Sequence, residues 1–168
     1  MIVLIAQVTG VAEISAIISD KQSQVLERAR KYDITNFYLP LTKDRSDWDR
    51  KLLDLVNKLK PDLVVSAGFM RILSPEFVSR FDCINSHPSL LPAFPGAHAV
   101  RDALAAGVTE TGCSVHWIDA GIDTGPIIGQ IPMPIYPTDS EETLHERIKI
   151  AERALIVETV SALLADKH

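Results

Sequence analysis

Short apolar runs alternate along this chain with longer segments whose apolar residues recur at helical spacing. We interpret residues 2–6, 11–18, 36–39, 63–67, 83–85, 114–118 and 127–133 as strands. Strand–helix alternation of this kind predicts an α/β fold with a mainly parallel, twisted sheet and helices on both of its faces. A chain of 168 residues with 46% hydrophobic content can bury one substantial core. We therefore expect residues 1–168 to form a single domain.

Two segments carry clear helical signatures. In residues 48–59, Trp48, Leu52 and Val56 fall on one face at helical spacing, and residues 144–163 show the same pattern. Ser140, followed by two glutamates, is typical of a helix N-cap with acidic residues in the first turn, which suits the helix dipole.

The first two predicted strands are separated by only four residues, Gln7-Val-Thr-Gly10. A parallel crossover needs about a dozen residues or more and usually contains a helix. Either these strands form a hairpin, or a connection that once contained a helix has been lost.

Composition narrows the classes of function. The formal charge is −5 and no cluster of Lys and Arg is present, which argues against a nucleic-acid-binding protein. Residues 1–6 are apolar but have no basic flank and are too short to span a bilayer, so we expect no signal peptide and no membrane segment. Cys83 and Cys113 have no metal-binding or redox spacing, and we interpret them as buried free thiols, which fit a reducing, cytoplasmic compartment.

The residues that carry chemistry lie in two loops rich in Pro and Gly. One is Asn85-Ser-His-Pro-Ser-Leu-Leu-Pro-Ala-Phe-Pro-Gly96 and the other is Ile118-Asp-Ala-Gly-Ile-Asp-Thr-Gly-Pro126. Asn85 and His87 follow an apolar strand, where an open α/β sheet binds its ligands. An amide, an imidazole and the Asp123 carboxylate can hold a carbonyl, stabilise its developing charge and move a proton. This set favours acyl transfer without a metal or a covalent nucleophile.

Each of these residues also has a simpler explanation when taken alone. His87 could be a structural histidine, Asn85 a cap and Asp123 a turn residue. Their joint occurrence in two stiff loops favours a site, although spacing alone does not show that the loops meet.

Other polar and aromatic residues receive structural interpretations. His98 either lines the site or begins a helix. We expect His116 to be a satisfied interior side chain and His145 to be solvated. Trp48 and Trp117 fit core positions.

The run from Ala67-Gly-Phe-Met-Arg-Ile-Leu-Ser74, through residues 85–96, to Asp123-Thr-Gly-Pro126 closely resembles the folate-dependent formyltransferases. The similarity extends from about Val11 to the C-terminal helix. It implies a Rossmann-like formyltransferase fold. It also implies transfer of the formyl group of 10-formyltetrahydrofolate to the amine of 5-phosphoribosylglycinamide, in de novo purine biosynthesis. The folate is then a co-substrate, with no tightly bound cofactor and no metal.

The resemblance also implies roles for individual residues. Asn85 matches the asparagine that hydrogen-bonds the formyl oxygen, His87 the catalytic histidine, and Asp123 the aspartate that keeps this histidine charged. Arg45 resembles an arginine that reaches the folate, and Glu152 an acidic residue near the glycinamide. The backbone of one segment is expected to line the pterin pocket, and its residues are Met70, Arg71, Ile72 and Leu73. Residues 118–122 would close over the pterin ring.

The chain departs from the family pattern between Ala6 and Val11. The family places a Gly-rich loop and a helix after its first strand, where they bind the substrate phosphate. Either the molecule lacks this loop and helix, or residues are missing from the sequence at this point. Two alternatives to the transferase therefore stay open: a formyltetrahydrofolate deformylase, and a non-catalytic folate-binding protein if the loop is truly absent. The sequence leaves the oligomeric state open, with a homodimer as one option.

Overall fold

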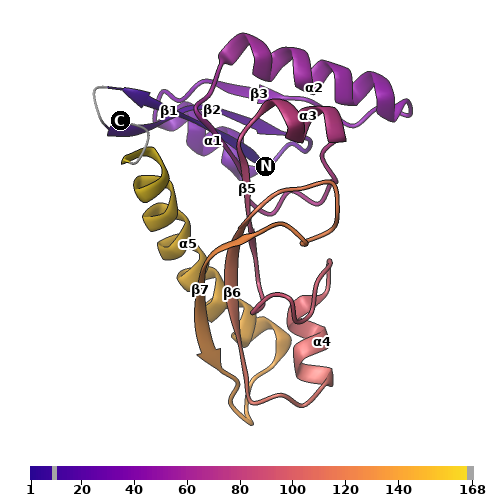
Figure 1. The fold of residues 1–168 in the computed structure, drawn as a ribbon, viewed down its shortest axis with the longest axis vertical. Helices are drawn as coiled ribbons and strands as arrows, with labels where there is room; N and C mark the ends of the chain where they lie inside the picture. The colour runs from indigo at the N-terminus through magenta and orange to yellow at the C-terminus, as the bar shows by residue number, and fades with distance from the viewer. Residues whose placement is uncertain (9–10, 166–168) are drawn as a thin grey trace. The chain divides into compact units, whose positions relative to one another are not determined.

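The computed structural model describes residues 1–8 and 11–165 of the chain (Figure 1). The described residues divide into two compact units, the first running from Met1 to Cys83 and the second beginning at Ile84. Each unit contains strands that pair with one another and helices that pack on them. The single-domain organisation expected from the sequence stays a prediction.

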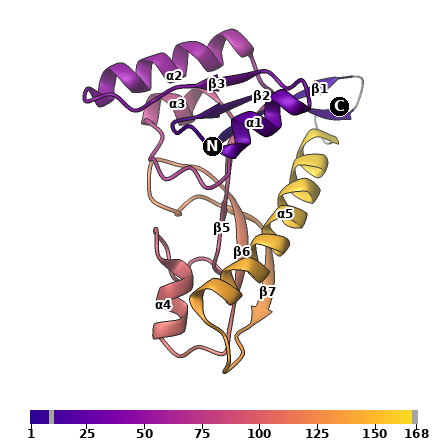
Figure 2. The ribbon, with the colours of Figure 1, turned by 180° about the vertical axis from the view of Figure 1, so that it is seen from behind.

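The first unit contains a sheet with the strand order β3-β2-β1-β4. Its elements are β1 (Ile2–Val8), β2 (Val11–Ser19), α1 (Gln24–Lys31), β3 (Asn36–Tyr38), α2 (Arg45–Leu59), β4 (Leu63–Ser66) and α3 (Pro75–Arg80). In both views, α1 and α2 lie on opposite sides of β1, β2 and β3 (Figures 1 and 2). Helices therefore cover both faces of this part of the sheet, as the sequence predicted.

Strands β1 and β2 form an antiparallel pair, with Ile2 opposite Ile18 and Ala6 opposite Glu13. The four-residue connection is thus explained by a hairpin; its residues 9 and 10 lie outside the described part of the chain. Strand β1 also runs antiparallel to β4, whereas β2 and β3 are parallel.

The second unit contains the strand order β5-β6-β7, and both of its pairs are antiparallel. Its elements are β5 (Cys83–His87), α4 (Ala99–Ala105), β6 (Glu110–Trp117), β7 (Ile127–Pro134) and α5 (Glu141–Ala165). Helix α5 packs against β6 and β7. The prediction of a mainly parallel sheet is wrong. The strand pairing is mixed. Connections without a helix reverse the chain between β1 and β2 and between β6 and β7, and the connection through α4 reverses it between β5 and β6.

Side-chain caps begin both long helices, α2 and α5. The Asp44 carboxylate accepts a hydrogen bond from the Asp47 N–H at 3.1 Å at the start of α2. Ser140 Oγ accepts one from the Thr143 N–H at 3.2 Å at the start of α5, which confirms the predicted cap. These bonds satisfy N–H groups that have no partner within the helix.

Cys83 and Cys113 are buried free thiols, as predicted. Burial raises the pKa of Cys83 to about 12 and that of Cys113 to about 11.

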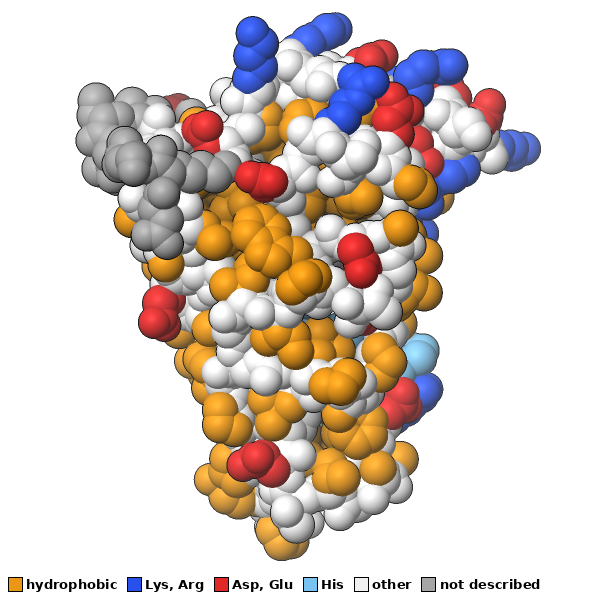
Figure 3. Space-filling view, viewed as in Figure 1, with side chains coloured by type: hydrophobic (Ala, Val, Ile, Leu, Met, Phe, Trp, Pro, Cys, Tyr) orange, Lys and Arg blue, Asp and Glu red, His pale blue; other side chains and the backbone are white. Residues whose placement is uncertain are grey.

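Figure 3 shows Lys and Arg side chains over α2, where acidic side chains accompany them. Among the described helices, none is long and apolar enough to cross a membrane.

Two isoleucines of α5 test how much of the stability comes from burial. Ile148 is fully buried, whereas Ile150 is 66% exposed on the same helix. Ile148→Ala should lower the free energy of unfolding by about 2–5 kcal/mol, because it removes buried methyl groups and leaves a cavity. Ile150→Ala should change it by less than about 0.5 kcal/mol. Urea denaturation of both variants measures the difference, and equal losses would contradict the packing of α5.

Candidate active site

His87 is the last residue of β5 and is 4% exposed. Its Nε2 lies 2.8 Å from the Phe94 carbonyl oxygen, and its Nδ1 lies 3.4 Å from Asp123 Oδ2. Both ring nitrogens therefore face oxygen atoms that can only accept a hydrogen bond. This arrangement suits a doubly protonated, positively charged imidazole ring.

The loop that supplies the Phe94 carbonyl is fixed by two side chains from neighbouring strands. Ser114 Oγ donates to the Ser89 carbonyl at 2.6 Å and accepts from the Leu91 N–H at 3.0 Å. Gln130 Nε2 donates to the Leu91 carbonyl at 2.9 Å. Because these bonds tie residues 89–91 to β6 and β7, the loop backbone is held next to His87.

Phe94 and Asp123 both have positive φ angles, of 52° and 54°. For residues with a side chain this left-handed conformation costs roughly 1–2 kcal/mol. Each residue nevertheless directs an oxygen towards His87. Asp123 Oδ2 also accepts a hydrogen bond from the Gly96 N–H at 2.8 Å, which joins the two Pro- and Gly-rich loops. The loops that the sequence could not place together therefore do meet.

The Asp123 carboxylate is shared between two histidines. While Oδ2 faces His87, Oδ1 lies 3.5 Å from His116 Nε2. A hydrogen bond from the protonated form of His116 lowers the pKa of Asp123. The Gly96 N–H and the positive charge of each imidazole in its protonated form add to this effect, whereas burial opposes it. Asp123 is therefore ionised at neutral pH.

Asn85 lies beside the same pair of histidines. Its Nδ2 is 3.3 Å from His116 Nε2. In the β5–β6 register, Asn85 is opposite His116 and His87 is opposite Ser114, so these four side chains share one face of the two strands. The structure thus brings Asn85, His87 and Asp123 together, with His116 between the amide and the carboxylate.

His116 is the residue whose importance the sequence analysis missed. It is 2% exposed, which confirms the expected interior position, but its ring contacts two residues of the predicted set. The available signal was spacing: Ser114 and His116 are two positions apart, like Asn85 and His87, which sets each pair on one face of its strand. His98, in contrast, is exposed at the N-cap of α4, which confirms a helix-start role.

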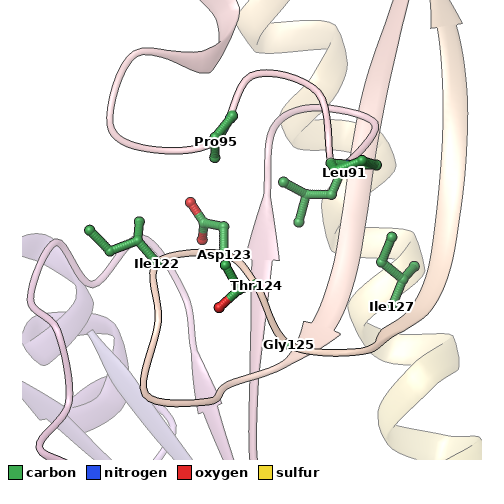
Figure 4. Close-up of a pocket in the computed structure, with 8 residues that line it drawn as sticks. Leu91, Pro95, Ile122, Asp123, Thr124, Gly125 and Ile127 are labelled. Carbon is green, nitrogen blue, oxygen red and sulfur yellow. The ribbon is translucent and has the colours of Figure 1, made fainter.

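A pocket of about 260 Å³ opens beside Asp123. Figure 4 shows the Asp123 carboxylate directed towards the space between Ile122 and Pro95. Leu91, Pro92, Thr124, Gly125 and Ile127 complete its lining. Pockets for drug-sized ligands typically enclose about 300–1,000 Å³. This one has room for a fragment of such a molecule next to the carboxylate.

Glu152, on α5, lies outside this hydrogen-bonded cluster. Ser86 Oγ donates to Glu152 Oε1 at 3.0 Å, and Ser86 leaves β5 on the face opposite Asn85 and His87. Burial raises the pKa of Glu152, while the Ser86 hydroxyl and the charges of His145 and His87 act in the opposite direction.

Apart from Asn85, the predicted folate-binding residues belong to the first unit. An Arg45 Nη2–H donates to the Ile72 carbonyl, so two of them are in direct contact. Arg45 also pairs with Asp49 at 2.8 Å and lies 5.2 Å from the centre of the Trp48 ring.

Within the segment 70–73 the side chains differ in exposure. Met70 is 68% and Ile72 56% exposed, while Leu73 is buried in the core. Arg71 pairs with Asp20, with Nε 3.1 Å from Oδ2. Leu73 can therefore contribute its backbone to a binding site, but not its side chain. In the described residues no group of three or more His, Cys, Asp and Glu side chains is suited to hold a metal ion.

Comparison with known proteins assigns the chain to a family. Residues 4–160 match the family model described as Formyl transferase. The chain belongs to the formyl transferase family. Among its relatives, phosphoribosylglycinamide formyltransferase of Mycobacterium tuberculosis (strain H37Rv) is 50% identical over 156 residues, which cover 90% of this chain and 73% of that protein. The enzyme of the same name from Escherichia coli K12 is 42% identical, over 84% of this chain and 69% of that protein.

Solved structures of this family have the same fold. Glycinamide ribonucleotide transformylase 1 from Symbiobacterium toebii is 35% identical, with a TM-score of 0.88 over 92% of this chain and 76% of that one. Phosphoribosylglycinamide formyltransferase from Coxiella burnetii is 39% identical, with a TM-score of 0.86 over 92% and 75%. The resemblance to the folate-dependent formyltransferases and the expected formyltransferase fold are confirmed.

The Glu152 carboxyl group predicts a measurable dependence of stability on pH. Because its pKa is raised in the folded chain, the stability contributed by the protonated form is complete below about pH 4.5 and is lost as the pH rises through the folded pKa. Glu152→Gln imitates the protonated form and keeps an acceptor for Ser86. The variant should therefore be more stable than the wild type at pH 7 and equal to it at pH 4. Chemical denaturation at both pH values measures this, and an unchanged difference would contradict the burial of the charge.

Proposed function

We propose that this protein transfers the formyl group of 10-formyltetrahydrofolate to the amine of 5-phosphoribosylglycinamide. The main support is the convergence of Asn85, His87 and Asp123 in one hydrogen-bonded cluster. The chain is also 50% identical to a phosphoribosylglycinamide formyltransferase of Mycobacterium tuberculosis. The folate acts as a co-substrate.

We propose a cytoplasmic location, supported by the two free thiols, and a homodimer as the assembly to test by light scattering.

In the proposed reaction, the amine attacks the formyl carbon and negative charge develops on the formyl oxygen. An N–H of Asn85 and a protonated His87 stabilise this oxygen as hydrogen-bond donors. Asp123 favours the charged form of His87 because an opposite charge lies next to the ring. The C–N bond to the folate then breaks, and the proton lost by the amine reaches the departing nitrogen through His87 or a water molecule.

His87 must exchange a partner to take part. Its Nε2–H is bonded to the Phe94 carbonyl at 2.8 Å, and its Nδ1 faces Asp123. We propose that the formyl oxygen replaces the Phe94 carbonyl as the acceptor of the Nε2–H, while the contact with Asp123 is kept. The charged ring would then always have a negative or polar oxygen on each side.

The binding roles of the other residues are part of the same proposal. Arg45 and the segment Met70, Arg71, Ile72 and Leu73 would bind the folate, mainly through the segment's backbone. The bond from Arg45 to the Ile72 carbonyl supports their action as one unit. Glu152 would bind the glycinamide acceptor.

Alanine variants of the cluster test the proposal. Asn85→Ala should lower kcat by about 10²–10³-fold, because it removes a donor to the developing oxyanion. His87→Ala and Asp123→Ala should lower it by at least about 10²-fold. Asp54→Ala, which removes an exposed carboxylate on α2, is the matched control and should leave kcat unchanged. Formyl transfer is measured spectrophotometrically, and circular dichroism confirms folding. A His87→Ala enzyme with near wild-type turnover would reject the assignment.

The same preparation separates the transferase from its alternatives. Formate release that does not require the acceptor would indicate a deformylase, in which water replaces the amine. Tight binding of a folate analogue in calorimetry, without any turnover, would indicate a non-catalytic folate-binding protein.

We further propose that the chain lacks the family's phosphate-binding loop and helix between Ala6 and Val11. The antiparallel pairing of β1 with β2 supports this, because a hairpin leaves no helix N-terminus after β1 to bind an anion. An intact mass near 18.5 kDa would show that the residues are truly absent.

This proposal predicts weak selection for the phosphate of the acceptor. Phosphoribosylglycinamide and its dephosphorylated form should bind with dissociation constants that agree within about threefold. Charge-assisted hydrogen bonds to the phosphate would make the phosphorylated form bind more tightly, and the proposal is that this chain does not form them. Isothermal titration calorimetry measures both constants. A preference of tenfold or more for the phosphorylated form would mean that another part of the chain binds the phosphate.

A further inference from the structure

His116 is the next-to-last residue of β6, opposite Asn85, and its ring is almost fully buried. Nδ1 is 2.8 Å from the Trp117 carbonyl oxygen. A carbonyl oxygen can only accept, so Nδ1 carries a proton and donates it there. In the neutral ring this leaves a lone pair on Nε2, which faces the site.

Asn85 and Asp123 both lie near this Nε2, and each can form a hydrogen bond with only one of its two protonation states. Asn85 Nδ2, at 3.3 Å, is a donor and needs the lone pair. Asp123 Oδ1, at 3.5 Å, is an acceptor and needs a proton on the ring. A neutral His116 therefore binds the amide, and a protonated His116 binds the carboxylate.

The amide of Asn85 has two N–H groups, and only one of them is used by His116. When Nε2 accepts this hydrogen bond, it fixes the rotation of the amide about its terminal torsion, which otherwise has a broad energy minimum. The direction of the second N–H is then fixed as well. A donor aimed in advance at the developing charge is what an oxyanion site requires.

We infer that His116 is a positioning residue for the transfer reaction, whose neutral ring orients the Asn85 amide towards the formyl oxygen. This inference rests on the proposed function. Protonation of His116 turns its Nε2–H towards Asp123, which releases Asn85 and draws part of the carboxylate's charge away from His87. Both changes lower the rate on the acid side.

Charged groups around His116 are few. Asp123 and Asp119 come from the loop after β6, and His87 comes from β5. On α5, which packs against β6, Glu152 is bonded to Ser86 on the opposite face of the strands.

Nuclear magnetic resonance on the full chain, labelled with ¹⁵N, tests the contact without turnover. At pH 8 the His116 ring nitrogens should show the Nδ1–H tautomer. The side-chain amide signals of Asn85, assigned through Asn85→Ala, should move between pH 8 and pH 5. In His116→Gln, whose amide does not titrate, the chemical shifts of these signals should not change between the two pH values. In the control His98→Gln, which alters an exposed histidine of the same unit, the chemical shifts should change as in the wild type. An Nε2–H tautomer, or Asn85 signals that are identical in His116→Leu, would overturn the inference.

Kinetics complete the test. His116→Leu should lower kcat by about 10–100-fold, because the oxyanion donor loses its orientation, while KM for the folate changes by less than about threefold. His116→Gln, whose amide oxygen can accept the Asn85 N–H, should recover part of kcat and flatten the acid side of the pH–rate profile. Equal kcat values in His116→Leu and the wild type would also overturn the inference. A wild-type protein without transfer activity contradicts only the proposed function, since the resonance signals are read without turnover.

Discussion

The antiparallel register of β5 and β6 is the constraint on which the site depends. It sets Asn85 opposite His116 and His87 opposite Ser114, so an amide, two imidazoles and a hydroxyl share one face of two hydrogen-bonded strands. A shift of one residue would move one strand's side chains to the other face and separate every pair. Backbone hydrogen bonds between the two strands thus position these four side chains, and the loops add the Phe94 carbonyl and the Asp123 carboxylate.

The loops bring a negative charge to this face and hold it there. Asp123 reaches both imidazoles with its two oxygens, and the Gly96 N–H binds the same carboxylate. Ser114 and Gln130 fix the backbone of the first loop from the neighbouring strands. The positive φ angles of Phe94 and Asp123 are maintained because these hydrogen bonds oppose relaxation of the backbone. The unfavourable backbone conformations of Phe94 and Asp123 thereby keep the Phe94 carbonyl and the Asp123 carboxylate close to the buried His87 ring.

The sequence predicted all seven strands, six of them to within two residues at each end, although β6 begins four residues before its predicted start. It also predicted the long helices α2 and α5, because each carries a strong apolar period or a clear cap. It gave no bounds for α1 and α3, and for α4 it offered only a start at His98 as one of two interpretations, because these helices are eight residues long or shorter. It predicted the wrong strand directions, because apolar runs do not encode pairing; the short link between Ala6 and Val11 was the one residue-level sign of a reversal. Asn85, His87 and Asp123 were found from their loops, but His116 was not, because only the register reveals what a polar side chain inside a strand faces.

The hairpin of β1 and β2 and the cluster around His87 lie in different units of the chain. Every hydrogen bond of the cluster joins residues between 85 and 130, and none of them involves β1 or β2. A change in the connection after β1 can therefore alter the binding of an acceptor's phosphate while the contacts of Asn85, His87, His116 and Asp123 stay the same. The contacts of the cluster are thus independent of the connection after β1, so a loss of phosphate binding there would not require the loss of the cluster.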